Sequence, residues 1–202
     1  MRAATKSSPR TKPPEERRDE LMNAAQRLFL KRGVAPTTIE QITSSAGVAK
    51  GTFYLYFSSK DDILAMLGER FGEEHLASIK AAITAKPKEG WQERLATWAR
   101  ACADSYLDSI RLHDIVFYGS RPRTREGLVD NVVIDHLSSL LQAGVDARAW
   151  SVADPRFTAV FLFSGLHAIV DDAYSKEKRL NRSRLAQKAV QLFFRAVGLP
   201  PR

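Results

Sequence analysis

Cysteine, long apolar runs and catalytic motifs are scarce or missing in this sequence, and each absence excludes a class of protein. Cys102 is the only cysteine, so no disulfide can form within the chain, which fits a reducing compartment. The most apolar stretch, 157–170, is interrupted by polar residues and falls short of the roughly 18 apolar residues of a membrane span. The first residues include no apolar segment of the secretory type. We therefore expect a soluble cytoplasmic protein.

Signals of catalysis and of metal binding are also missing. The sequence contains no Gly-x-Ser-x-Gly turn, no glycine-rich phosphate loop and no His-Glu-x-x-His. Its histidines are widely spaced in the sequence. Only His167 has a possible metal-binding neighbour one turn along the same expected helix, Asp171, four residues later. That pair could bind a metal, but a hydrogen bond between the two is the commoner arrangement. We expect no enzyme, no cofactor and no metal site.

Positive charge is concentrated at one end of the chain, within a net charge of +8. Residues 1–60 hold 11 Lys and Arg against 5 Asp and Glu, whereas residues 61–202 hold 20 against 18. A basic end joined to a nearly neutral remainder is typical of a protein that binds nucleic acid through that end. Residues 1–14 include four cations, three prolines and no acid, which predicts a disordered basic arm. This arm is either a solvated tail or a contact to the minor groove or phosphates beside a binding site.

Apolar residues recur with helical spacing along most of the chain. The spacing predicts a helix over 15–32 and a long one from Ser59 to about Lys86, which Pro87 ends. From Gly90 onward the pattern stays helical, with breaks at 119–125, 144–155 and 175–181, and no alternating strand pattern occurs. The sequence therefore predicts an all-α fold of about nine helices.

Residues 37–57 predict a helix-turn-helix. The first of two short helices has an apolar stripe formed by Ile39, Ile42 and Ala46. Its capping box can be formed by the Thr-x-x-Glu of residues 37–40 or, equally well, by the Thr-x-x-Gln of residues 38–41. Gly47 ends this helix, because glycine adopts the left-handed conformation that reverses the chain.

The second short helix, about 50–56, separates two kinds of residue on its two faces. Phe53 and Phe57 point toward a core. The other face offers groups that suit phosphates and base edges, from Lys50, Gly51, Thr52, Tyr54 and Tyr56. An ordinary amphipathic helix with exposed tyrosines is the alternative interpretation.

The flanking residues decide between these interpretations. The pattern consists of Leu28, Phe29, Gly33, Thr37-Thr38-Ile39, Ile42, Ala46-Gly47-Val48, Lys50-Gly51-Thr52-Phe53-Tyr54, Tyr56-Phe57, Lys60 and Leu64. With these residues, over about 15–67, the sequence resembles the TetR family of bacterial transcriptional regulators. Ala49 departs from that family's pattern, which usually has serine or threonine there, so a hydroxyl contact to phosphate and a helix N-cap are missing.

The resemblance implies a three-helix DNA-binding domain over 15–60 and a larger helical domain over 61–202 that binds an effector and forms a homodimer. The implied DNA contacts are Thr38, Lys50, Gly51, Thr52, Tyr54, Tyr56 and Lys60, the last on a phosphate. The implied function is sequence-specific regulation of transcription, as a repressor released from a palindromic operator by a small ligand. Two alternatives stay open: an all-α ligand-binding or enzymatic protein with an incidental basic end, and a nonspecific architectural DNA binder.

Large aromatic residues in the second domain suggest where an effector binds. Trp98, Cys102 and Tyr106 form a helical stripe that is either packed core or the lining of an apolar pocket. Residues from the same stripe and the following helices that could share that lining are Phe117, Tyr118, His136 and Leu140. Because the lining is aromatic and thinly charged, we expect a largely apolar or aromatic effector.

The last two helices, about 157–170 and 183–197, carry wider apolar faces than one partner helix requires. In the TetR family these helices pair with their copies in a second subunit. The expected interface residues are Phe161, His167, Leu185, Ala189 and Phe193.

Overall fold

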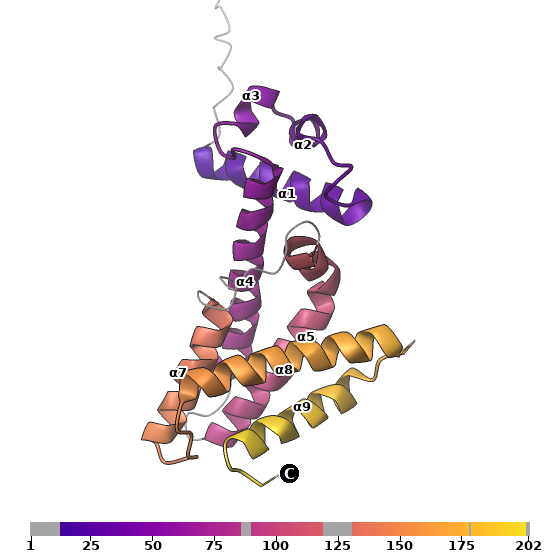
Figure 1. The fold of residues 1–202 in the computed structure, drawn as a ribbon. Helices are drawn as coiled ribbons and strands as arrows, with labels where there is room; N and C mark the ends of the chain where they lie inside the picture. Colours follow the sequence, from indigo (N-terminus) through magenta and orange to yellow (C-terminus); the bar gives the residue numbers. More distant parts are fainter. Residues whose placement is uncertain (1–12, 86–89, 119–130, 178, 201–202) are drawn as a thin grey trace, which may run out of the picture. The chain divides into compact units, whose positions relative to one another are not determined.

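The computed structural model describes residues 13–85, 90–118, 131–177 and 179–200, except for the side chain of Tyr118 (Figure 1). Within these ranges the chain forms eight helices and no strand. The all-α prediction is confirmed, and the number of helices is close to the one expected. Residues 1–12 of the expected arm, Pro87 and the expected break at 119–125 lie outside the described ranges. None of the described helices is long and apolar enough to cross a membrane.

The chain divides into two compact units, residues 1–67 and residues 68–202, which we call the head and the body. The described part of the head contains α1 (Pro14–Arg32), α2 (Ile39–Ser45), α3 (Lys50–Phe53) and the first turns of α4 (Lys60–Thr84). The division falls within α4, so one helix contributes to both units.

The core of the head lies behind the two short helices. Leu21 and Phe29 of α1 are almost completely buried, as are Ile42 of α2 and Phe53 of α3. The rings of Phe53 and Phe57 lie 5.5 Å apart. Burying a phenylalanine side chain stabilises a fold by roughly 1.5–3 kcal/mol, so these rings are a large part of what holds so small a unit together.

Two local predictions in the head have a clear outcome. The capping box is formed by Thr38 and Gln41: the Gln41 amide donates to the Thr38 hydroxyl (3.2 Å), and the Thr38 amide donates to the Gln41 side chain (3.1 Å). The predicted extension of the second helix to Tyr56 is wrong. After Phe53 the amides of Leu55 and Tyr56 bond to carbonyls three residues earlier, which tightens the chain into a turn instead of an α-helix.

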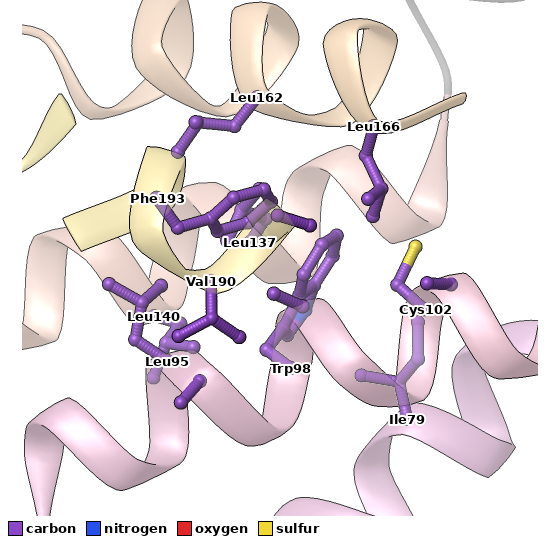
Figure 2. Packing of buried hydrophobic residues seen from close by; sticks show 14 of the residues in the cluster. Ile79, Leu95, Trp98, Cys102, Leu137, Leu140, Leu162, Leu166, Val190 and Phe193 are labelled. Atoms are coloured by element: carbon purple, nitrogen blue, oxygen red, sulfur yellow. The ribbon is translucent and has the colours of Figure 1, made fainter. Parts of the chain in front are cut away.

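The described body contains the rest of α4 with α5 (Trp91–Tyr118), α7 (Val132–Asp146), α8 (Pro155–Lys176) and α9 (Arg182–Ala196). Helix α5 packs chiefly on α9, and α7 packs chiefly on α8. Side chains from these helices form one apolar core, part of which Figure 2 shows around Trp98 and Phe193. The two rings lie 5.9 Å apart.

A second close contact in the body links a glycine to a tryptophan. Gly144 ends the buried face of α7, and a Cβ atom there would lie 2.0 Å from the ring of Trp150. The indole nitrogen of Trp150 donates to the carbonyl of Leu141 (2.9 Å). Only glycine leaves room for this ring, which closes the loop between α7 and α8 over the core.

Candidate nucleic-acid interface

The turn between α2 and α3 brings the two short helices together as the sequence predicts. Gly47 has a φ of 69°, the left-handed conformation that glycine adopts without strain. The amide of Val48 donates to the carbonyl of Thr43 (3.0 Å). Ala49 is the N-cap of α3 and has no side-chain cap, as its methyl group requires.

Helix α3 buries one side chain and exposes its neighbours. Phe53 is 0% exposed, whereas Tyr54 is 54% and Leu55 is 78% exposed. The predicted facing of this helix is therefore confirmed for the phenylalanine and for the tyrosine that follows it. Leu55 was not among the predicted DNA contacts. The available signal was a large apolar residue between two tyrosines at a position that the core does not use.

Lys50, the first residue of α3, forms an ion pair with Glu40 of α2, and the two side chains are 55% and 58% exposed. The hydrogen bond from Lys50 is the main reason why the pKa of Glu40 falls to about 2, and Glu40 in turn raises the pKa of Lys50. The ammonium group is thus held on the surface beside Tyr54. An exposed pair of this kind contributes little to stability, so the lysine can exchange its partner at low cost.

The remaining predicted contacts of α2 and α3 differ in exposure. Thr38 and Gly51 are exposed, and Thr52 and Tyr56 are half-buried. A Cβ atom at Gly51 would meet no atom within 4 Å. The fold of the chain itself therefore does not require glycine at this position.

Lys60 differs from what the resemblance implies. Its ammonium group donates hydrogen bonds to the carbonyls of Val34 (2.9 Å), Ala35 (3.1 Å) and Thr37 (2.7 Å). A lysine has three donors, and all of them are used inside the head. A phosphate contact would require these bonds to break.

The residues predicted to line a pocket in the body fall into two groups. Trp98 is completely buried and its indole nitrogen donates to His136 (3.1 Å), with Leu140 buried in the same apolar core. Tyr106 belongs to the other group, where its hydroxyl donates to Asp171 (2.6 Å). Cys102 is buried, with its sulfur 3.4 Å from His75 Nε2.

Phe117 is 41% exposed, and the side chain of Tyr118 lies outside the described residues. A shallow cleft on α7 and the start of α8 is lined by other residues, among them Ser138, Gln142 and Arg156. A ligand pocket along the Trp98 stripe stays a prediction.

The second group is a buried cluster of rings that the sequence did not predict. Tyr106 lies 4.5 Å from the ring of His113 and 4.4 Å from that of His167. The predicted hydrogen bond between His167 and Asp171 is not the one the structure assigns to either residue. Asp171 accepts from Tyr106, and His167 Nδ1 lies 3.0 Å from the carbonyl of Phe163. Within the described residues no group of His, Cys, Asp and Glu is arranged to hold a metal ion.

Burial lowers the pKa of two histidines. The pKa of His75 falls to about 4, first because burial penalises the imidazolium and then because His167 lies nearby. The pKa of His136 is lowered by burial and then by Lys80 and Arg94. Both rings are therefore neutral at pH 7, and His136 Nδ1 can accept the hydrogen bond that Trp98 donates.

Three of the five residues expected at the dimer interface are instead buried within their own chain. Leu185, Ala189 and Phe193 are at most 7% exposed and lie in the core of their own chain. They offer little surface to a second chain, because α9 packs its apolar stripe chiefly on α5. Phe161 is 66% exposed, and His167 is half-buried in the ring cluster.

Helix α3 places a phenylalanine in the core and presents a cation, a phenol and a bare backbone on the surface. A second helix and a tight turn precede it. This arrangement defines a helix-turn-helix DNA-binding protein. Residues 21–67 match the family model for bacterial regulatory proteins of the tetR family. The chain belongs to the TetR family and is a transcriptional regulator.

Relatives of known sequence agree with this assignment. The chain is 25% identical to the HTH-type transcriptional regulator YfiR of Bacillus subtilis, over 91% of this chain and 92% of that protein. It is 40% identical to the regulator TtgR of Pseudomonas putida over 30% of this chain, and that match spans only 29% of TtgR. The structure resembles that of SmeT in complex with triclosan, with a TM-score of 0.66 and 22% identity over 90% of this chain and 91% of that one. SmeT is the repressor of a multidrug efflux pump of Stenotrophomonas maltophilia.

Proposed function

We propose that this regulator represses transcription by binding a near-palindromic operator as a two-fold dimer, and that a small, largely apolar ligand bound in the body releases it. The observation that carries the proposal is the surface of α3, where Lys50, Tyr54 and Leu55 lie exposed around the buried Phe53. In this proposal a DNA-binding domain of about residues 15–60, which lies within the head, reads the DNA. A second domain of residues 61–202 binds the effector and the second subunit.

The chemistry of the exposed side chains fits a major groove. Lys50 can leave Glu40 for a phosphate, and Tyr54 can donate its hydroxyl to a phosphate or a base edge. Leu55 presents a methyl-rich surface to the methyl group of thymine. Gly51, where the fold leaves room for a Cβ atom, allows the DNA backbone to approach α3 closely. Thr38, Thr52 and Tyr56 complete this surface.

Two copies are needed because so short a helix reads few base pairs. The described part of the body leaves large apolar side chains on the surface, Phe157 (72% exposed), Phe161 (66%) and Leu192 (45%). The two phenylalanines lie one helical turn apart on α8 and form one stripe. We propose that this stripe, with Leu192 of α9, is the dimer interface in place of the buried residues of α9.

The residues of the body support a largely apolar ligand. Its core is rich in aromatic residues, and hydrogen-bonding groups such as His136 and Tyr106 lie within it. SmeT, which has a similar fold, is a repressor whose structure includes triclosan. A ligand that binds the DNA-free state more tightly by about 1–3 kcal/mol releases the operator five- to 150-fold.

A mobility-shift titration against DNA from upstream of neighbouring genes, with unlabelled nonspecific DNA as competitor, tests the operator proposal. We expect selective retardation, and a loss of roughly 1–3 kcal/mol of binding free energy in Tyr54→Ala or Lys50→Ala with an unchanged circular dichroism spectrum. Equal binding to all sequences would favour an architectural DNA binder instead. No binding to any DNA would favour the interpretation as a ligand-binding protein with an incidental basic end.

Light scattering tests the dimer. Phe161→Glu should convert a dimer into a monomer with an unchanged helix content, whereas Ser139→Glu, at an exposed position of α7, serves as the control. A wild-type protein that is monomeric at micromolar concentration would contradict the proposed interface.

Tryptophan fluorescence tests the ligand. Quenching of the Trp98 fluorescence by apolar compounds, with Trp98→Phe as the control, should parallel the loss of operator binding.

A further inference from the structure

Lys60 connects two parts of the head that are far apart in the sequence. Its three hydrogen bonds reach carbonyls 23 to 26 residues earlier in the chain. These carbonyls belong to the loop of residues 33–37, which joins the end of α1 to the start of α2. The same loop is held by Thr37, which is completely buried and whose hydroxyl donates to the carbonyl of Gly33 (2.7 Å).

The electrostatics explain why a cation belongs at this loop. The loop follows the C-terminal end of α1, where the helix dipole is negative and a positive group is favourable. Lys60 is also the first residue of α4, and a cation at the start of a helix is unfavourable for that helix. Asp61 and Asp62 follow it and suit that position. The lysine is therefore favourable because of the loop it contacts and not because of the helix it begins.

The loop determines where α2 starts. Thr38 caps α2 directly after Thr37, whose carbonyl receives the shortest of the three bonds at 2.7 Å. A displacement of the loop would move α2, and with α2 the turn at Gly47 and the surface of α3. Since operator reading requires α3 at a defined place in the groove, the position of this loop bears on binding.

We infer that Lys60 is a positioning residue for DNA reading, which clamps the loop of residues 33–37 to the start of α4, and that it makes no phosphate contact. This inference rests on the proposed operator binding. Lys50 provides the contrast, because its ammonium group is exposed and paired with a single surface carboxylate. The two lysines carry the same charge in the same unit, but only Lys50 is available to a phosphate.

Matched substitutions in the full-length protein separate the two roles. Each phosphate contact contributes about 0.9 to the slope of log K against log salt concentration. Lys50→Gln should therefore weaken operator binding and make the slope shallower by about 0.9 for each lysine that contacts DNA. Lys60→Gln should weaken binding about tenfold, as expected for lost hydrogen bonds to a charged group, with the wild-type slope.

Arginine at both positions sharpens the test. Guanidinium binds phosphate well, so Lys50→Arg should retain most of the affinity. The planar fork of arginine does not match three carbonyls around one ammonium nitrogen, so Lys60→Arg should bind as weakly as Lys60→Gln. Affinities are measured at a temperature where circular dichroism shows every variant fully folded. A role in stability alone would then leave the affinity of both Lys60 variants at the wild-type value, and this result would overturn the inference.

A Lys60→Arg variant that binds like wild type, together with a shallower slope for Lys60→Gln, would also overturn it and identify a phosphate contact. Amide hydrogen exchange without DNA provides a measurement that does not depend on the operator. Exchange over residues 34–41 should be faster in both Lys60 variants and unchanged in both Lys50 variants. If the wild-type protein selects no DNA, the proposed function fails, and equal exchange in all variants then overturns the clamp as well.

Discussion

Within the body, the longest side-chain hydrogen bonds span more of the sequence than within the head. Among the described residues of the head, most side-chain hydrogen bonds join residues three or four positions apart, such as Thr38 with Gln41 and Ser58 with Asp62, and the longest, from Lys60, span 23 to 26 positions. In the body, Tyr106 donates to Asp171 across 65 positions, and Trp98 donates to His136 across 38. Contacts of the first kind can be inferred from local spacing, whereas those of the second kind exist only after the helices have packed.

The largest expected effect tests whether the head is a separate unit. Phe53→Ala removes the ring at the centre of a small core, which should destabilise the head by about 3–5 kcal/mol and abolish operator binding. All three tryptophans, Trp91, Trp98 and Trp150, lie in the body. Tryptophan fluorescence should therefore keep its wild-type unfolding midpoint while far-ultraviolet circular dichroism loses helix. A shifted fluorescence midpoint would mean that the two units unfold together.

Phe193→Ala should have the opposite signature. The ring is 2% exposed and packs on Trp98, so its removal should destabilise the body by about 3–5 kcal/mol and shift the tryptophan emission. Phe161→Ala is the matched control on the surface, with an effect on the stability of the monomeric chain within about 0.5 kcal/mol. Equal destabilisation by both substitutions would show that the apolar stripe of α9 does not face the core.

The same contrast explains what the sequence predicted and what it did not. The helix-turn-helix, the capping box alternatives and the facing of Phe53 and Tyr54 all follow from residues within one or two helical turns of each other. The predicted end of α3 was wrong because the amides of Leu55 and Tyr56 bond to carbonyls three residues earlier, and residue type does not separate that turn from α-helix.

Predictions for the body were less accurate, because apolar spacing indicates that a helix face is covered but does not indicate which element covers it. The stripe of α9 was assigned to a second subunit, yet Phe193 lies against Trp98 of its own chain. Phe161, in a similar pattern on α8, is exposed. The Tyr106 cluster was missed because its members come from two helices, α5 and α8, that are far apart in the sequence. In the head, the hydrogen bonds of Lys60 were missed for a similar reason, since its partners lie more than 20 residues earlier in the chain.

A smaller effect is expected from pH in the body, between pH 6.5 and 5. His75 faces Cys102 and Ser105 of α5 and His167 of α8, and its pKa in the folded protein is about 4 against an ordinary value of 6.5. Between these values the unfolded chain binds a proton that the folded chain does not bind. Folding stability therefore falls as the pH falls, by about 2 kcal/mol between pH 6.5 and 5.

Denaturant titrations followed by tryptophan fluorescence at pH 7, 6 and 5 measure this loss. His75→Gln retains a polar side chain of similar size but does not titrate, so its stability should fall less steeply with pH than that of wild type. The other titrating groups, among them His136, are common to both proteins and cancel in the comparison. Parallel curves would mean that His75 is protonated as readily in the folded chain as in the unfolded one.

The smallest effect belongs to the head and tests the local character of its contacts. Thr38→Ala removes the hydroxyl that accepts from the Gln41 amide, which should destabilise the head by about 1 kcal/mol. Thr38→Ser keeps the acceptor at the same position, and serine caps helices at least as well as threonine, so its stability should stay near that of wild type. Exchange of the Gln41 amide with solvent reports the cap directly and should accelerate in the alanine variant alone. Because the cap is made within α2 and its N-terminal neighbour, neither variant should alter tryptophan fluorescence in the body. If serine and alanine destabilise the head equally, the methyl group of Thr38 and not its hydroxyl stabilises the start of α2, and the capping box contributes nothing measurable.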